Sequence, residues 1–394
     1  MRGVAEAHDR AVSTLATPPA TIALVDGGVR LDVGGRIAVL HPQWLRDRST
    51  EPGQVDRTNR QRLYTPLDLP GDLVVVGYAA SDGAVVVEFS DGHRATYALD
   101  ALMRALGWLA DAEAPPAPEP WSAPLDPLPY VDWAGIGWDA ATADPDAVIA
   151  YLDGFFRFGF AVLRGTPTEL GTVRRVADRL GYISGNNFGW VFDVRAEATP
   201  TDLAYTPIAL SAHTDQPYRR PVPGIQLLHC LRNDAPGGDS TLVDGLAAAV
   251  ALAADDPDAH AALAGVETEW RYDTGDDTVV GRGRVLEYEP DGRFHRIRFS
   301  TKLDSPVPSP GVDLAAYYRG RRRLAEWLDD PAHRLVFRLE PGDVVVFDNH
   351  RLLHGRTAFD PSFGSRHLQG CYIDHDGPDT MYRLAVRRRA SMSR

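Results

Sequence analysis

Cysteine is scarce in this chain, and long hydrophobic runs are absent from it. Two cysteines, Cys230 and Cys371, occur among 394 residues, and both lie in apolar, strand-like stretches. A secreted scaffold held by disulfides would carry more, so we expect two buried thiols in a reducing cytoplasm, although the sequence leaves a disulfide between them open. No apolar run reaches the roughly 18 residues that a membrane-spanning helix needs, so we expect no membrane association.

An excess of positive charge is also lacking. The formal net charge is −13, which argues against a nucleic-acid binder, because such a protein depends on basic surface for its affinity. Residues 1–17 are mixed in charge and lack the apolar segment of a secretion signal, and we expect a disordered leader there. The hydrophobic fraction of 44% is ordinary for a soluble protein, and the length suffices for two domains or one large one.

Proline is concentrated in one segment, residues 113–129, which reads EAPPAPEPWSAPLDPLP. Such proline density prevents helices and central strands and is typical of a semi-rigid linker. The sequence therefore predicts a front domain over residues 18–112 and a larger domain over residues 130–394.

The two predicted domains differ in pattern. Short apolar runs separated by Asp-Gly turns predict a small β-rich N-terminal domain. The larger domain opens with two helical patterns, over residues 144–159 and 167–183, and then becomes strand-rich, with one long helix over residues 312–330. Because the helices cluster instead of alternating with strands, we predict a mainly β (α+β) protein whose catalytic domain is a double-stranded β-helix, or jelly roll, with flanking helices.

An aspartate follows a histidine by two positions in LSAHTDQPYRR, residues 210–220. On an extended strand such residues point to the same face, so His213 and Asp215 would present an imidazole and a carboxylate side by side. The pair is either a surface hydrogen bond or part of a metal site, since two imidazoles and one carboxylate commonly hold iron(II) with positions left open. The later stretch PGDVVVFDNHRLLHGRTAF offers two candidates for the second imidazole, His350 and His354.

An arginine, Arg366, heads the predicted strand RHLQGCYID. A buried arginine needs an anionic partner, and its planar fork fits a carboxylate through two hydrogen bonds. The partner is either a structural Asp or Glu or a dicarboxylate co-substrate.

The order HxD, distal histidine, arginine resembles that of the iron(II)- and 2-oxoglutarate-dependent dioxygenases. The similarity is greater still to the gamma-butyrobetaine hydroxylase branch of the taurine-dioxygenase superfamily, and it spans about residues 20–385. It is carried, in order along the chain, by WLRD, SDGH, FGWVFDV, LAYT, LSAHTDQPY, PGIQLLHC, GGDSTLVDG, FDNHRLLHGR and SRHLQGCY.

The resemblance implies that His213, Asp215 and His354 hold iron(II). It implies that Arg366 binds the distal carboxylate of 2-oxoglutarate and that Ser240, whose alternative role is to cap a turn, meets the other end of this co-substrate. Enzymes of this kind use dioxygen to convert 2-oxoglutarate to succinate and carbon dioxide while a substrate carbon is hydroxylated. Protein side chains then position the reactants and exclude water.

For the substrate, the resemblance implies a small zwitterionic amine or betaine, similar to gamma-butyrobetaine or a trimethylammonio-phosphonate. Aromatic faces attract such cations, and the matching stretch supplies Phe188, Trp190, Phe192 and Tyr205, which could equally be core residues. Gln216 stands where the butyrobetaine enzymes carry an aromatic residue. An amino acid or a natural-product intermediate is therefore the alternative substrate.

The front domain departs from the resemblance. Relatives often bind zinc there through cysteines after WLRD and a later histidine, whereas this chain reads WLRDRSTEPGQVDRTNRQRLY and keeps only His93. One histidine cannot build a closed tetrahedral site, so we expect no zinc. The family also implies a homodimer, with the front domain aiding dimer contacts or covering the mouth of the active site.

Two other function classes remain at this point. Two histidines and an aspartate also suit a zinc hydrolase, which would need a general base near the metal but no arginine for a keto acid. The second remaining class is a jelly-roll module that binds a ligand without turnover. The intact set of candidate metal-binding residues and the arginine count against this class.

Overall fold

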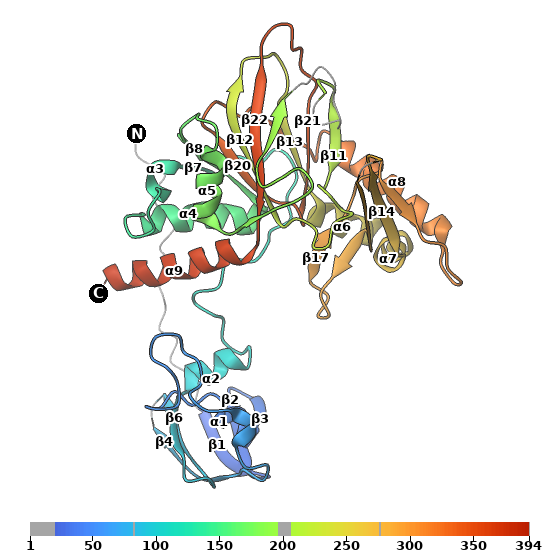
Figure 1. Ribbon diagram of the computed structural model, residues 1–394. Coiled ribbons are helices and arrows are strands. Elements are labelled where there is room, and N and C mark those ends of the chain that lie inside the picture. The colour runs from blue at the N-terminus through green and yellow to red at the C-terminus, as the bar shows by residue number, and fades with distance from the viewer. Residues whose placement is uncertain (1–19, 82, 196–205, 276, 394) are drawn as a thin grey trace. The chain divides into compact units, whose positions relative to one another are not determined.

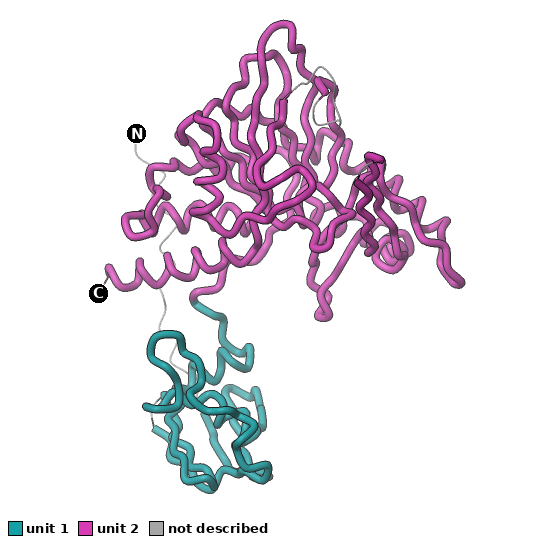
Figure 2. The backbone as a smooth tube through the Cα atoms, in the orientation of Figure 1, with its two compact units in different colours: residues 1–112 teal, residues 113–394 magenta. Residues whose placement is uncertain are grey.

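The computed structural model of the chain describes residues 20–81, 83–195, 206–275 and 277–393. The predicted leader over residues 1–17 and the predicted cage residue Tyr205 lie outside the described residues. The chain divides into two compact units, residues 1–112 and 113–394 (Figure 2). Among the described residues, none of the helices has the length and apolar character needed to cross a bilayer.

The first unit contains two three-stranded antiparallel sheets. Their strands are β1 (Ala20–Val25), β2 (Gly28–Val33) and β3 (Arg36–Leu40), and β4 (Val75–Ser81), β5 (Ala84–Phe89) and β6 (Arg94–Ala98). Three short helices accompany them, α1 (Pro42–Arg46), η1 (Pro66–Asp68) and α2 (Leu99–Ala105). Alternate residues of β2, β5 and β6 are buried, as in strands that each turn one face to a common core.

Two β-sheets form the centre of the second unit (Figure 1). The large sheet has the order β10-β22-β12-β20-β8-β7, with β9 beside β22, and the small sheet has the order β11-β21-β13-β19. The large sheet consists of β7 (Tyr130–Asp132), β8 (Phe160–Arg164), β9 (Ile183–Ser184), β10 (Phe192–Arg195), β12 (Ile225–Asn233), β20 (Val344–Asp348) and β22 (Arg366–Ile373). The small sheet consists of β11 (Leu210–His213), β13 (Ser240–Asp244), β19 (Leu335–Phe337) and β21 (Leu352–Arg356).

Strand β20 shows why the predicted apolar run is buried on both faces. Val344 and Val346 pack into a cluster with α4, α5 and α9, whereas Val345 and Phe347 pack against residues of the small sheet. Successive side chains of a strand point to opposite faces, so an unbroken apolar run fits a strand that is covered on both sides. The two sheets thus enclose a common core, which confirms the predicted mainly β jelly roll with helices.

Helices cover the outer faces of both sheets (Figure 1). Those outside the large sheet are α3 (Trp133–Ile136), α4 (Pro145–Phe158), α5 (Thr172–Leu180) and α9 (Asp376–Met392). A third apolar cluster, on the outer side of the small sheet, includes residues of α6 (Gly245–Asp255), α7 (Pro257–Gly265), α8 (Leu314–Asp329), β14 (Thr268–Asp273), β15 (Thr278–Gly283), β16 (Leu286–Tyr288) and β17 (Phe294–Ile297). Strand β18 (Asp304–Pro306) pairs with β14. Helix α8 was predicted from the sequence, whereas α6 and α7 were not. Their alanine-rich sequences lack the apolar residues at intervals of three and four that mark an amphipathic helix.

The two cysteines lie on opposite faces of the large sheet. Cys230 packs between the sheets, whereas Cys371 belongs to the cluster under the helices, and both are buried free thiols. A disulfide needs Cβ atoms that approach to about 4 Å, which the intervening backbone prevents. The structure therefore excludes the disulfide that the sequence left open.

A buried ion pair joins strand β13 to the start of β21. Arg351 Nε lies 3.0 Å from Asp244 Oδ1, and Arg351 Nη2 lies 2.8 Å from Asp244 Oδ2. Arg351 also donates to the carbonyls of Glu119 and Arg157, at 2.6 and 2.8 Å, so the pair ties the proline-rich segment to the barrel.

Exchanging Arg351 for methionine is expected to lower the free energy of unfolding by about 3–5 kcal/mol, because it leaves the Asp244 carboxylate charged and buried without its partner. Arg157→Met is the control, since its pair with Glu119 is about half exposed and should contribute less than about 1 kcal/mol. Urea denaturation measures both. Equal losses in the two variants would contradict the assignment.

Candidate metal centre and adjoining cavities

His213, Asp215 and His354 come together at one end of the small sheet. Strands β11 and β21 are neighbours, and His213 lies directly opposite His354 in their register, with ring centroids 4.4 Å apart. One oxygen of the carboxylate, Asp215 Oδ1, lies 3.4 Å from His213 Nε2 and 3.7 Å from His354 Nε2. The three candidate ligand atoms lie within 4.8 Å of one another, which is the spacing that a single ion requires.

Neighbouring groups hold the Asp215 carboxylate in this orientation. Its second oxygen, Oδ2, accepts a hydrogen bond of 2.6 Å from the Tyr372 hydroxyl. Its backbone N–H donates to Asn349 Oδ1 at 2.7 Å, and Asn349 Nδ2 donates to the Asp215 carbonyl at 3.2 Å. The carboxylate therefore keeps one oxygen anchored and the other turned to the two imidazoles.

The tautomer of His213 follows from its hydrogen bond. Its Nδ1 lies 2.9 Å from the Ser211 carbonyl oxygen, and because a carbonyl only accepts, Nδ1 carries the hydrogen. The lone pair on Nε2 then points toward Asp215 Oδ1. Fixing the imidazole through its other nitrogen is the usual arrangement for a histidine that ligates a metal.

Protonation states in the cluster suit a metal ion. Burial alone would raise the pKa of Asp215, but the neighbouring His354 and His213 and the Tyr372 hydrogen bond hold it below its usual range. Burial lowers the pKa of His354 to about 4. At neutral pH the carboxylate is therefore ionised and the His354 imidazole is neutral, which are the states that bind cations.

The alternative ligand His350 lies outside this cluster. It belongs to a second group with Asp348 and His375, whose candidate ligand atoms also fall within 4.8 Å of one another. His375 Nε2 lies 2.9 Å from Asp348 Oδ1, and His350 Nε2 lies 3.2 Å from the Val222 carbonyl oxygen. Internal hydrogen bonds account for this second group, and the geometry selects His354 as the partner of His213 and Asp215.

A small cavity of about 90 Å³ opens beside the cluster, between the two sheets. We call it the inner cavity. Its polar lining contains His213, Asp215 and His354 at one end, together with Ser240, Gln226, Arg356 and Arg366. Strands β13 and β22 thus deliver both residues that the sequence analysis assigned to 2-oxoglutarate, Ser240 and Arg366, to one space.

Arg366 has no carboxylate partner within 4.0 Å among the described residues, although its side chain is 5% exposed. Its Nε donates to the Gly238 carbonyl at 2.9 Å. Burial, the leading cause, lowers the pKa of Arg366 to about 10, a value at which the group is still charged at neutral pH. The structural salt bridge that the sequence left as an alternative is therefore absent from the described residues, and the charge faces a cavity that an anion can enter.

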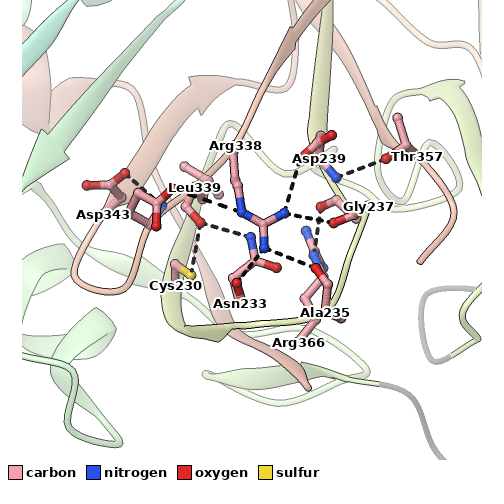
Figure 3. A network of polar contacts seen from close by, with 12 residues as sticks. Cys230, Asn233, Ala235, Gly237, Asp239, Arg338, Leu339, Asp343, Thr357 and Arg366 are labelled. Carbon is pink, nitrogen blue, oxygen red and sulfur yellow. Dashed lines mark hydrogen bonds and ion pairs between the residues drawn. The ribbon is translucent and has the colours of Figure 1, made fainter. Parts of the chain in front are cut away.

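The loop that contacts Arg366 is held by a second arginine, Arg338 (Figure 3). Arg338 donates to Asp239 Oδ1 at 3.3 Å and to three carbonyl oxygens of the same loop, those of Asn233, Ala235 and Gly237. Asp239 N in turn donates to Thr357 Oγ1 at 3.0 Å. The network fixes the loop on which Gly238 and Ser240 lie, one on each side of Asp239.

A larger cavity of about 210 Å³ lies on the other side of His213 and Asp215, which line both spaces. We call it the outer cavity. Phe188 and Phe192 line it as predicted, and so does Gln216. Its lining also contains aromatic and basic side chains that were not predicted from the sequence: Tyr218, Tyr272, Lys302 and Tyr372. Tyr372 could have been found, because it follows Arg366 by an even number of residues on one strand and therefore shares its inward face.

The aromatic rings of the outer cavity contact one another. Phe188 and Tyr272 meet edge to face with centroids 5.9 Å apart, and Tyr218 and Tyr272 stack at 5.1 Å. Phe192 lies 5.4 Å from Tyr372. The rings thus form two groups, both on the lining of one space.

Trp190, which the sequence placed in the predicted cage, does not line either cavity. Its side chain is 59% exposed, and its ring lies against Gly185. A tight turn between Asn186 and Gly189, with Gly189 at φ +101°, reverses the chain after Phe188 and carries Trp190 away. Sequence proximity to Phe188 and Phe192 was therefore misleading.

Three buried polar atoms around the cluster have no hydrogen-bond partner among the described residues. They are Gln216 Oε1 in the outer cavity, Gln226 Oε1 in the inner cavity, and His354 Nδ1. Gln216 also adopts a left-handed backbone, with φ +48°, a conformation that costs energy for a residue with a side chain. Buried polar atoms are rarely left unpaired, so these positions fit a site that is completed by bound molecules.

The hydrolase alternative finds no support in the cavity linings. Asp215 is the only carboxylate and His213 and His354 are the only histidines among the described lining residues. A hydrolase that activates metal-bound water needs a further base within hydrogen-bonding reach. In the first unit, His93 Nε2 lies 2.9 Å from Ser49 Oγ, and the expected absence of zinc there stays a prediction.

Comparison with known proteins agrees with this geometry. Residues 123–372 match the family described as "Taurine catabolism dioxygenase TauD, TfdA family". A gamma-butyrobetaine dioxygenase of Pseudomonas sp. (strain AK-1) is 35% identical over 95% of this chain and 97% of its own. The human gamma-butyrobetaine dioxygenase is 30% identical over 68% of each chain, and a trimethyllysine dioxygenase of Neurospora crassa is 29% identical over 87% of this chain and 80% of its own. The chain therefore belongs to the TauD/TfdA family of iron(II)- and 2-oxoglutarate-dependent dioxygenases, in the branch that contains the gamma-butyrobetaine dioxygenases.

Proposed function

We propose that this dioxygenase hydroxylates a carbon of a small betaine-like zwitterion that carries a quaternary ammonium group. The observation that carries the proposal is the outer cavity, where aromatic rings gather directly beside the candidate metal ligands. The names of the similar enzymes, gamma-butyrobetaine and trimethyllysine dioxygenases, support the same substrate class.

The metal ligands in this proposal are His213, Asp215 and His354. An iron(II) ion held by them would supply the chemistry that splits dioxygen and oxidises both 2-oxoglutarate and the substrate. Tyr372 and Asn349 orient Asp215, and the Ser211 carbonyl orients His213. The protein side chains bind the metal and the substrates, orient them and shield them from water, and none of these side chains has to transfer a proton.

The inner cavity is the proposed site of 2-oxoglutarate. Arg366 would pair with the distal carboxylate, since the guanidinium is buried and has no acidic partner among the described residues. Ser240, 8% exposed on the adjacent strand β13, would offer its hydroxyl to the same co-substrate. At the other end of the cavity lie His213, Asp215 and His354. A co-substrate held by Arg366 would therefore have its keto-acid end next to the metal.

The outer cavity is the proposed site of the ammonium group. A trimethylammonium ion has no N–H to donate, so it gains little from a single carboxylate and is instead attracted to aromatic faces. Asp215 is the only carboxylate among the described lining residues, and it is already used by the metal site. The rings of this cavity belong to Phe188, Phe192, Tyr218, Tyr272 and Tyr372. Because such a lining suits a methylated ammonium group, an amino acid with a free amine is the less favoured substrate.

The function is tested by incubating the protein with iron(II), 2-oxoglutarate, dioxygen and a panel of zwitterionic amines. Gamma-butyrobetaine, a trimethylammonio-phosphonate and N-trimethyllysine are compared with their unmethylated amines. Succinate and hydroxylated product should appear together, in equal amounts, with the methylated compounds. Succinate release that is independent of every amine, or turnover restricted to unmethylated amino acids, would contradict the proposal.

Replacing Phe192 by leucine should raise KM for gamma-butyrobetaine about 2- to 30-fold, since a cation–π contact contributes about 0.5–2 kcal/mol. Its carbon isostere 5,5-dimethylhexanoate, which keeps the carboxylate but lacks the positive charge, should bind the wild-type and Phe192→Leu proteins with similar inhibition constants. Phe363→Leu, at a ring that is 74% exposed, is the control and should change neither value. Equal weakening of both ligands would mean that Phe192 acts only through shape.

The homodimer and the cytoplasmic location expected above remain proposals. Light scattering of the purified chain measures the oligomeric state directly. A mass equal to one chain at micromolar concentration would contradict the dimer.

A further inference from the structure

Lysine is almost absent from this protein. The chain contains 41 lysines and arginines, and 40 of these (41 − 1) are arginine, because Lys302 is the only lysine. This single lysine lines the outer cavity, beside the candidate metal ligands His213 and Asp215.

A β-turn between β17 and β18 presents Lys302 to the cavity. Leu303 N donates to the Ser300 carbonyl at 3.1 Å, which closes the turn, and all four residues from Ser300 to Leu303 contribute to the cavity lining. The turn is anchored on its far side, where Arg271 N donates to the Leu303 carbonyl at 3.2 Å. Lys302 thus has a fixed backbone and a free, exposed side chain at the cavity.

The ammonium group of Lys302 makes no hydrogen bond or ion pair with any residue that the structure describes. The nearest acidic residue in the sequence, Asp304, is already paired, since its two oxygens lie 2.7 and 2.6 Å from the guanidinium of Arg321. Glu269, on the neighbouring strand β14, pairs with Arg282 at 2.9 Å. The protein therefore supplies other partners to both acids and leaves the lysine charge unneutralised.

The charges of the outer cavity are consequently unequal. Among its described lining residues, Asp215 is the only acidic group, and its two oxygens face the imidazoles and the Tyr372 hydroxyl. Lys302 is the only lysine or arginine of that lining. An exposed cation beside a mostly apolar surface attracts an anion, and nothing in the described protein fills that role.

The choice of lysine over arginine has a physical meaning here. A guanidinium is a wide planar fork that pairs with flat groups and stacks on rings, whereas an ammonium is a compact point charge on a flexible stem. In a cavity lined with aromatic rings, a guanidinium would compete with the substrate cation for the ring faces. An ammonium has a shorter reach and can meet the terminal anion of a small substrate.

We propose that Lys302 is a specificity residue that binds the anionic end of the substrate. This inference rests on the proposed function, because it assigns the second charge of the same zwitterion. The rings of the outer cavity receive the ammonium group, and Lys302 receives a carboxylate or phosphonate. The protein thereby selects zwitterions over simple quaternary amines such as choline.

A pair of substrates of the same shape tests this assignment. Gamma-butyrobetaine and its amide, 4-trimethylammoniobutanamide, differ only in the negative charge. The wild-type protein should prefer the carboxylate in kcat/KM, and Lys302→Met should reduce that preference about 10- to 100-fold, the range expected for one hydrogen bond to a charged group. Lys302→Arg keeps the charge and should retain most of that preference, but kcat/KM for both substrates should fall because the guanidinium competes for the ring faces.

Arg322→Met is the matched control, because Arg322 is an exposed cation on helix α8 that makes no contact with either cavity. It removes the same charge from the protein and should leave the preference unchanged. A Lys302→Met protein that keeps the wild-type preference overturns the proposal, whereas the succinate assay on wild type decides the proposed function separately.

Chemical labelling provides a test that does not require turnover. Acetic anhydride transfers an acetyl group to an amine and releases acetate, and in this chain only Lys302 and the α-amino group can be acetylated at nitrogen as primary amines. With iron(II) and 2-oxoglutarate present without dioxygen, gamma-butyrobetaine should slow acetylation of Lys302 several-fold, and the amide should not. Peptide mass spectrometry measures both sites, and the α-amino group is the internal reference. Equal labelling rates with and without gamma-butyrobetaine would overturn the assignment.

Discussion

Replacing Asp215 by alanine should reduce succinate formation by a factor on the order of 1,000 or more, because the metal would then lose the only anionic ligand that the protein supplies and several kcal/mol of stabilisation. Asp215 Oδ1 lies 3.4 and 3.7 Å from the two imidazole nitrogens, and no other carboxylate lines either cavity in the described chain. His213→Ala should have a similar effect. The measurement is succinate release under saturating iron(II), 2-oxoglutarate and dioxygen.

The metal content of the variants distinguishes loss of the site from loss of the fold. Iron(II) binding is measured by dialysis under nitrogen, and folding is measured by thermal denaturation. His350→Ala is the control, because His350 faces the Val222 carbonyl and lies outside the cluster of His213, Asp215 and His354. It should keep its iron and its activity. Full activity in Asp215→Ala, or loss of iron only in His350→Ala, would overturn the ligand assignment.

Arg366→Ala is expected to raise KM for 2-oxoglutarate about 10- to 150-fold, which corresponds to about 1.5–3 kcal/mol for hydrogen bonds to a charged group. Arg366 is 5% exposed, its Nε donates to the Gly238 carbonyl at 2.9 Å, and no described carboxylate pairs with it. Steady-state kinetics with 2-oxoglutarate as the varied substrate measures the change. KM for the amine substrate should change much less.

The obvious control for Arg366 is another arginine of the same network. Arg338→Met removes a cation that contacts the loop carbonyls and leaves Arg366 itself intact (Figure 3). Its effect on KM for 2-oxoglutarate should be clearly smaller than that of Arg366→Ala. An unchanged dependence on 2-oxoglutarate in Arg366→Ala would mean that the co-substrate carboxylate binds elsewhere, with Arg356 as the next candidate.

Both predictions depend on parts of the site that the sequence anticipated well. The sequence paired His213 with Asp215 on the assumption of a continuous strand, but β11 ends at His213, and Asp215 reaches the cluster from the following turn, which Asn349 holds. His354 and Arg366 were found through their order along the chain and the family resemblance. Spacing alone did not choose between His350 and His354; the resemblance favoured His354, and the register that places it opposite His213 agrees.

The substrate side was predicted less completely, for a physical reason. Cavity walls are assembled from segments that are distant in sequence, and Tyr218, Tyr272 and Lys302 come from three of them, a turn, strand β14 and another turn. Trp190 lies away from both cavities because a tight turn at Gly189 changes the direction of the chain within two residues. The rarity of lysine was visible in the sequence and would have singled out Lys302 without any structure.

The sequence by itself determined what local chemistry dictates: the β-rich character of the chain, the strand that ends in His213, the apolar strand before His354 and the need of Arg366 for an anion. Tertiary structure alone decided which distant residues share a space. It put Cys230 and Cys371 on opposite faces of one sheet, turned Trp190 outward and brought Lys302 to the substrate cavity. The difference arises because side-chain alternation is fixed by the backbone of a single strand, whereas the approach of distant strands and turns depends on the packing of the whole barrel.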